Sequence, residues 1–151
     1  MSHLPMEQTH VFLRFSGVAD QRWEIIQAWK GFPKSTIGSQ LIRSLDIICA
    51  NLVEGDGRYS DGEAIHFFTI ARASARESKY WISVSSRRGL ISESLSAELV
   101  ESLNHGMQML NKLIEYRRHT KNQGSVKEAT AQYNHDSGGH IEYSEVASKD
   151  T

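Results

Sequence analysis

The feature that most limits the fold of this chain is the spacing of its apolar residues, which recur every three or four positions over most of the first 121 residues. This spacing places apolar side chains along one face of an α-helix. The alternating pattern typical of β-strands does not compete with it. Four such runs follow one another with short connections, so the sequence predicts an all-α fold, an antiparallel up-down four-helix bundle. In the first run the apolar residues are Val11, Phe12, Phe15, Val18, Trp23, Ile26 and Trp29.

Local signals predict the limits of the first two helices. The first run extends from about Glu7 to Lys30, and we expect Phe32-Pro33 to close it, because proline disfavours helical backbone in the residue before it. The second helix is expected to run from near Ser35 to about Glu54. Gly55 and Gly57 would then supply the left-handed backbone that ends a helix in a tight turn.

The third and fourth helices also carry start and stop signals. Ser60-Asp61-Gly62-Glu63 matches a capping box, in which the Ser60 side chain accepts from the amide of Glu63 and the Glu63 side chain accepts from the amide of Ser60. The third helix therefore starts there, and we expect it to end at Gly89, which follows two arginines. The fourth follows Ser92 and is expected to end within residues 116–121.

The composition changes after Lys121. Residues 122–151 contain two bases and five acids, a net charge of −3, so residues 1–121 carry +2 of the total of −1. This excess is too small to indicate nucleic-acid binding by itself. The sequence predicts a four-helix bundle over residues 1–121 and a polar, acidic, mostly disordered tail over residues 122–151, with one short helical turn near Lys127 to Gln132.

Cysteine usage and hydropathy limit the class of protein. The single cysteine, Cys49, lies in an apolar run and has no partner for an intramolecular disulfide, so we expect a small core residue. No stretch approaches the roughly 20 apolar residues that a membrane-spanning helix needs. The N-terminus also lacks the pattern of a signal peptide. We expect a cytoplasmic protein with no membrane partner.

The stretch NLVEGDGRYSDGE, residues 51–63, could be a phosphate loop, a metal site or a helix corner. A nucleotide-binding loop follows a strand and carries Lys-Ser or Lys-Thr, and neither is present, so a helix corner is favoured. Glu63-x-x-His66 has the spacing used by di-iron bundle proteins, but Glu101-x-x-x-His105 does not repeat it. No Ser/His/Asp or Cys/His set has a persuasive spacing. We expect no catalytic residue, no metal and no cofactor.

Polar residues close to the apolar stripes are more informative, because charges there are costly unless they are paired. A salt-bridged network that aligns the helices, or a subunit interface, is favoured over catalysis. The residues are Arg43, Asp46, Asn51, Glu54, Arg72, Ser74, Arg76 and Glu77.

Two basic clusters end the last two helices. Arg87 and Arg88 end the third helix, and Arg117, Arg118 and His119 with Lys121 end the fourth. In an up-down bundle these ends lie at opposite poles, where bases also complement the helix dipole. Repeated around a ring of subunits, each cluster would become a positive rim able to contact phosphates.

Several segments together resemble one known family. They are Gln40 to Arg43, Ala50 to Arg58, Phe67 or Phe68 with Ile70 to Glu77, and Tyr80 to Ile82. This order resembles the four-helix-bundle proteins encoded in the intervening sequences of bacterial 23S rRNA genes, over about Ala19 to Tyr116. Ile47, Cys49 and Ala73 stand where that family usually has Ser, Gly and Gly, which makes the core larger and more apolar.

The resemblance implies an up-down bundle that assembles as a homopentamer and has no established enzymatic activity. A fold relative is the accessory partner of the reverse transcriptase in diversity-generating retroelements, so the implied partner is RNA or a nucleic-acid-handling protein, although fold alone does not imply function. In this setting Asn51, Glu54 and Arg58 would hold helix ends or adjoining subunits.

Three hypotheses follow. The first is a non-enzymatic, ring-forming protein that binds RNA, or an RNA–protein partner such as a reverse transcriptase, through basic rims. The second is a protein-binding assembly scaffold without nucleic acid, whose acidic tail folds on a partner. The third is a metal-carboxylate bundle enzyme built on Glu54, Glu63, His66 and Glu101.

Overall fold

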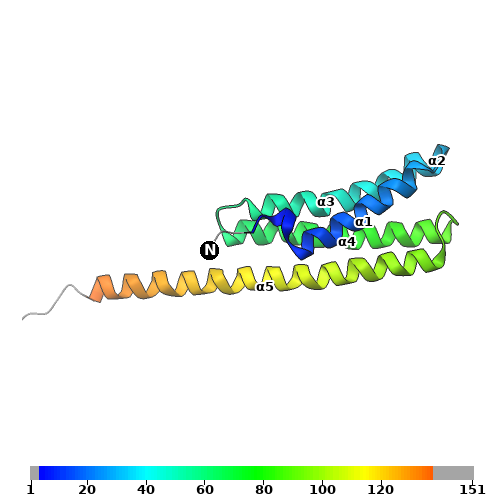
Figure 1. The fold of residues 1–151 in the computed structure, drawn as a ribbon. Helices are drawn as coiled ribbons and strands as arrows, with labels where there is room; N and C mark the ends of the chain where they lie inside the picture. Colours follow the sequence, from blue (N-terminus) through cyan, green and yellow to red (C-terminus); the bar gives the residue numbers. More distant parts are fainter. Residues whose placement is uncertain (1–3, 138–151) are drawn as a thin grey trace, which may run out of the picture.

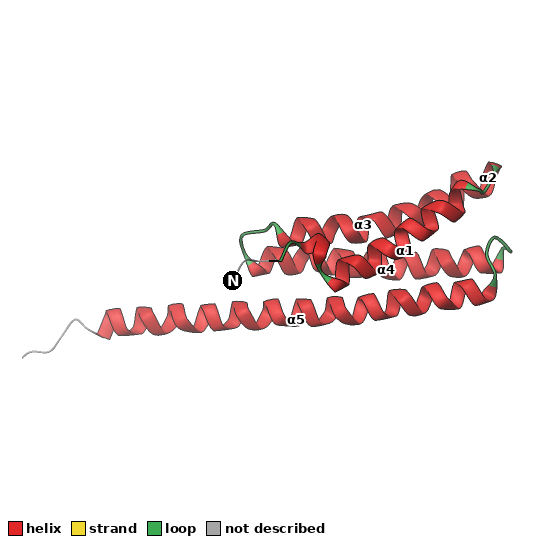
Figure 2. Ribbon diagram, viewed as in Figure 1, coloured by secondary structure: helices red, strands yellow, loops and turns green. Residues whose placement is uncertain are grey.

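The computed structural model describes residues 4–137, with side chains through residue 123. The described residues form helices and short connections without a strand (Figure 2). In chain order the elements are a 3₁₀ turn at Met6–Gln8, α1 at His10–Gln27, α2 at Gly31–Pro33, a π-helical turn at Lys34–Gly38, α3 at Ser39–Asp56, α4 at Asp61–Arg87 and α5 at Glu93–Ser137. The prediction of an all-α fold is confirmed.

The four long helices, α1, α3, α4 and α5, lie side by side and alternate in direction along the chain (Figure 1). Helix α1 packs against α3 and α5, and α4 packs against the same two helices. In the part of the chain that the structure describes, the diagonal pairs α1/α4 and α3/α5 do not approach each other in this way. This arrangement is the square cross-section of a four-helix bundle.

Apolar side chains from all four helices fill the space between them. The largest fully buried ones include Phe15 of α1, Leu45 of α3, Phe68 of α4 and Leu103 of α5. One polar contact lies inside this core, where the Ser78 hydroxyl donates to the Ser44 hydroxyl at 2.8 Å. Both serines are buried, and each also bonds to a carbonyl of its own helix, so neither hydroxyl is left without a partner.

The connection from α1 to α3 differs from the prediction. Pro33 does not close the first helix, because α1 ends at Gln27 and Pro33 lies in the helical turn that begins at Gly31. A first turn has no intrahelical partner for its amides, so the missing N–H of proline costs nothing there. Gly31 has φ +62°, which makes the reversal. Ser35 is not the N-cap; its hydroxyl donates to the carbonyl of Phe32.

The turn between α3 and α4 corrects a second prediction. Gly55 and Gly57 do not adopt left-handed backbone, since Gly31 and Gly89 are the glycines with positive φ among the described residues. Gly57 has φ −75° and ends α3 in right-handed geometry. Gly55 lies inside the helix, where a Cβ atom would stand 2.7 Å from the Phe68 ring. The role of Gly55 is therefore close packing, which the local sequence does not reveal.

The predicted limits of α4 are confirmed. Ser60 accepts from the amide of Glu63 at 3.3 Å, although the Glu63 carboxylate accepts from the Ser60 hydroxyl rather than from its amide. At the other end Gly89 has φ +71°, and the amides of Gly89 and Leu90 donate to Ser86 and Ser85. These two bonds form a Schellman motif.

Helix α5 starts as predicted but is longer than predicted. Ser92 accepts from the amide of Leu95 at 3.2 Å and caps the helix. The end expected within residues 116–121 is wrong, because α5 continues to Ser137 and includes the turn expected near residues 127–132. This segment lacks proline and contains good helix formers, so nothing local stops the helix. The rest of the predicted disordered tail, residues 138–151, lies outside the described residues.

Candidate functional site

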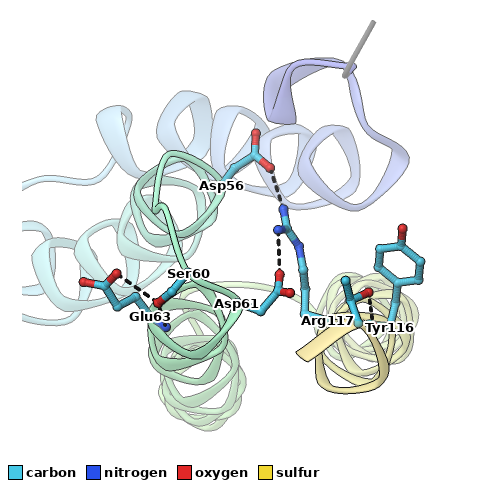
Figure 3. A network of polar contacts seen from close by, with 7 residues as sticks. Asp56, Ser60, Asp61, Glu63, Tyr116 and Arg117 are labelled. Carbon is cyan, nitrogen blue, oxygen red and sulfur yellow. Dashed lines mark hydrogen bonds and ion pairs between the residues drawn. The ribbon is translucent and has the colours of Figure 1, made fainter. Parts of the chain in front are cut away.

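One arginine of α5 ties together the corner between α3 and α4. Arg117 donates from Nη1 to Asp61 Oδ1 at 2.9 Å and from Nη2 to Asp56 Oδ1 at 3.3 Å. Figure 3 shows its guanidinium between the two carboxylates, which belong to the last residue of α3 and the first of α4. The side chains of Arg117, Asp56 and Asp61 are 21%, 15% and 19% exposed, so solvent screens these ion pairs only in part.

The outer side of the same corner carries a second group. Glu54 and Arg58 form an ion pair one turn apart at the same helix end, and both side chains are exposed enough that the pair is weak. The Arg58 guanidinium also lies 4.5 Å from the centroid of the Phe67 ring. Asn51 donates from Nδ2 to the carbonyl of Ile47 at 2.8 Å. These residues therefore make contacts within α3 and from its end to α4 at this corner.

The other polar residues near the stripes have separate partners. Arg72 donates to Asn111 Oδ1 at 3.0 Å and joins α4 to α5. Ser74 is buried, and its carbonyl accepts from Ser78. Glu77 accepts from Trp81 Nε1 at 3.2 Å. These contacts lie at different heights of the bundle, so they do not form one continuous network in the described part of the chain.

An open groove of about 760 Å³ runs along the outer surface of α3 beside α1. Trp23, which the spacing pattern placed in the apolar stripe of the first helix, stands at this groove with 55% of its surface exposed. Arg43 and Asp46 lie at the groove and are exposed. The lining residues are Trp23, Ile26, Gln27, Lys34, Gly38, Ser39, Ile42, Arg43, Asp46, Ile47 and Ala50.

Two ionisable groups beside the groove have shifted pKa values. Burial raises the pKa of the Asp46 carboxyl, and the nearby charge of Asp20 on α1 raises it further. Burial also raises the pKa of the Cys49 thiol to about 11, with Asp46 and Asp20 adding to the effect. The seam between α1 and α3 therefore disfavours negative charge. Cys49 is half-buried and packs against the core as predicted.

The basic clusters lie at opposite ends of the bundle, as predicted. Arg87 and Arg88 are exposed next to the α4–α5 turn. At the other end Arg118 is exposed, whereas Arg117 is held by the two aspartates. Lys121 lies beside the start of α4, where a Cβ atom on Gly62 would stand 3.6 Å from its Nζ.

Arg22 is a polar residue that sequence reasoning missed. It is only 3% exposed, and its Nε and Nη1 atoms have no hydrogen-bond partner within the described structure. Burial lowers its pKa, against the opposing effect of the Glu98 charge. The signal was present in the sequence, because Arg22 stands four residues after Val18 and four before Ile26, on the apolar stripe itself.

The residues proposed as metal ligands do not form a ligand set, and two of them have other partners. Glu54 pairs with Arg58, and Glu63 caps α4 through Ser60. Within residues 4–123, whose side chains the structure describes, no group of three or more His, Cys, Asp or Glu side chains is placed to hold a metal ion. His66 instead makes an edge contact with the Phe67 ring at 5.6 Å.

The pattern of helices and corner residues matches a known family. A family model of the 23S rRNA-intervening sequence protein matches residues 8–112. The chain belongs to this family. The match agrees with the resemblance drawn from residues 19–116 and has no enzymatic activity attached to it.

A solved structure agrees with the fold of this chain. It is the crystal structure of a protein of unknown function from the S23 ribosomal protein family of Bacteroides thetaiotaomicron. The two chains align with a TM-score of 0.63 and 21% identity, over 69% of this chain and 97% of the other, which shows a shared fold. No curated protein matches the chain. None of the described helices has the length and apolar character required to cross a membrane.

Proposed function

We propose that this protein is a non-enzymatic, ring-forming cytoplasmic oligomer that binds RNA, or an RNA–protein partner such as a reverse transcriptase, through its basic ends. The observation that carries the proposal is the pair of exposed arginines at the C-terminus of α4. Arg87 and Arg88 form no ion pair with any described residue, so both guanidinium groups are available to phosphates.

The structure changes which bases carry this proposal. Arg117 belongs to the corner, because contact with a phosphate would have to compete with Asp56 and Asp61. Arg118 is exposed at the same end of the bundle, and it replaces Arg117 as the RNA-binding candidate there. The net charge of one bundle is small, so repetition around a homopentamer, the assembly expected from the family, would concentrate the charge into two rims.

RNA binding is tested by filter binding or fluorescence anisotropy with a single-stranded RNA over a series of salt concentrations. We expect the double variant R87Q/R88Q to bind more weakly and to flatten the plot of log K against log salt, by about 0.7 in slope for each phosphate that it no longer neutralises. R14Q is the matched control, because Arg14 is an exposed arginine near the start of α1, at the end of the bundle opposite to Arg87 and Arg88. Wild-type protein without salt-sensitive RNA binding would overturn the proposal.

The exposed apolar groove favours a second candidate, the protein-binding assembly scaffold without nucleic acid. It predicts a defined partner complex that survives nuclease treatment and disappears on truncation after Lys121. A complex that nuclease removes would instead support the RNA hypothesis.

A further inference from the structure

Two exposed apolar features lie on different helices of the bundle. The first is the groove along α3, which Trp23 borders and Ile42, Ile47 and Ala50 line. The second is on α4, where Tyr80 is 57% exposed and stands in edge contact with the Trp81 ring at 5.1 Å. Large exposed aromatic side chains next to an apolar groove mark interaction surfaces.

Tyr80 belongs to a narrow outward face of α4. Ala73, Arg76 and Tyr80 are all exposed, and their spacing of three and four residues places them on one side of the helix. We call these three residues the ridge. The ridge is convex because it is the outside of a single helix, whereas the surface beside α3 is concave. The two surfaces therefore have complementary shapes.

One pair of charges on these surfaces is complementary. Asp46 of the groove lies close to Asp20 of α1, and neither forms an ion pair with a described residue. Arg76 of the ridge is exposed and also has no ion-pair partner among residues 4–123. The groove also contains two bases, Lys34 and Arg43. The Lys34 ammonium is held by the carbonyl of Gln27, and Arg43 lies one helical turn before Asp46 on α3. An arginine entering beside Asp46 would relieve the repulsion between the two aspartates.

The matching residues lie at the same height along the bundle. The Ser44–Ser78 hydrogen bond places these two residues opposite each other on antiparallel helices. Asp46 is two residues beyond Ser44, and Arg76 is two residues before Ser78, so both are displaced equally in the same direction. Trp23 lies about one turn beyond Asp20, and Tyr80 about one turn beyond Arg76, on helices that run in the same direction.

We infer that the groove of one copy receives the ridge of a second copy of this chain, with Tyr80 packed beside Trp23 and Arg76 paired with Asp46. The contact is heterologous, because it joins two different surfaces. Because the groove and the ridge lie at the same height along the bundle, each copy would be rotated relative to the last without a shift along the bundle axis. The groove on α3 and the ridge on α4 belong to neighbouring helices of the bundle, not to diagonal ones. A heterologous contact of this kind closes into a ring when the rotation from one copy to the next is a whole fraction of a full turn. This inference rests on the proposed ring-forming function and specifies its subunit interface.

The test uses full-length chains with one surface disabled, W23E for the groove and Y80E for the ridge. Light scattering after size exclusion gives the mass of each variant, and circular dichroism checks that it is folded. We expect both variants to be monomers. Mixed together, they should form a dimer and nothing larger, because the ridge of the W23E chain and the groove of the Y80E chain are intact. L13E is the matched control, since Leu13 lies on the same helix as Trp23 and is 53% exposed.

Charge exchange tests the pairing itself. D46R and R76D should each dissociate the oligomer, and the double variant D46R/R76D should restore it. A Y80E variant that stays oligomeric, or a mixture that stays monomeric, would overturn the inference while leaving the ring and its RNA binding intact. A monomeric wild-type protein would overturn both the ring and this interface, and the salt-dependent RNA measurement would then decide separately whether RNA binding survives.

Discussion

A single missing methyl group at Gly55 allows α3 and α4 to approach closely. A Cβ there would meet the Phe68 ring at 2.7 Å and the Ala64 carbonyl oxygen at 3.1 Å, and Phe68 is fully buried. We expect Gly55→Ala to lower the free energy of unfolding by about 1–3 kcal/mol through overpacking. Gly57→Ala is the control, because its surroundings begin at 3.7 Å and its backbone is right-handed, and it should change stability by less than about 1 kcal/mol. Urea denaturation measures both. Equal effects would contradict this packing role.

The thiol of Cys49 gives a pH-dependent prediction at the same scale. Its pKa of about 11 lies roughly two units above that of an exposed cysteine, so at pH 8 the thiolate fraction is about 100-fold smaller. Alkylation by iodoacetamide should be slowed by at least that factor in the folded protein and restored in urea. The raised pKa also means that the folded state holds the proton more tightly. The resulting stabilisation is complete at neutral pH and is lost as the pH rises toward 11.

At the scale of the helices, most starts and stops follow from local chemistry. Ser60, Ser92 and Gly89 were predicted because each acts through backbone bonds within four residues. Pro33 and Gly55 were misassigned because their roles depend on context. A proline is compatible with the first turn of a helix as well as with its end. The conformation of a glycine depends on whether a side chain from another helix, here Phe68, occupies the adjacent space.

The attachment of α5 to the α3–α4 corner depends on Arg117. We expect Arg117→Gln to lower the free energy of unfolding by about 1–2 kcal/mol, because Asp56 and Asp61 would lose a charged partner in a partly buried position. Arg118→Gln should change stability by less than about 0.5 kcal/mol, because that side chain is exposed. Chemical denaturation compares the two. For RNA affinity we expect the opposite, with Arg118→Gln causing the larger loss. Equal free energies of unfolding for the two variants would exclude the structural role of Arg117.

At the scale of the whole molecule, the bundle was predictable and its surfaces were not. Apolar spacing defines the buried face of each helix, so residues such as Leu45 and Leu103 could be assigned to the core. The same spacing could not show that Trp23 lies outside, because its large apolar ring fits the stripe and only packing against α3 decides its position. The partners of Arg117 lie more than 50 residues away in the chain, beyond any local pattern.

The length of α5 leads to a prediction about the domain boundary. The last fully buried residue described is Ile114, and in Figure 1 the end of α5 extends well past the other helices. Truncation after Lys121 should therefore leave the free energy of unfolding of the bundle unchanged within about 0.5 kcal/mol, since a helix without tertiary packing adds little stability. Urea denaturation of the truncated and full chains measures this. A clear loss of stability would show that the removed segment packs on the bundle or on another copy.

The hydrogen bond between Ser44 and Ser78 has a consequence for how the two helices can slide. Stripes of leucine and alanine repeat nearly every turn, so shifting α3 along α4 by one turn, about 5.4 Å, would again bring apolar groups together. That slip would separate the two hydroxyls and remove the hydrogen bond between them, at a cost of about 0.5–1.5 kcal/mol, while each hydroxyl keeps the bond to its own helix. Two small polar side chains thus fix the register of α3 against α4, which the apolar residues alone would leave open to several alignments.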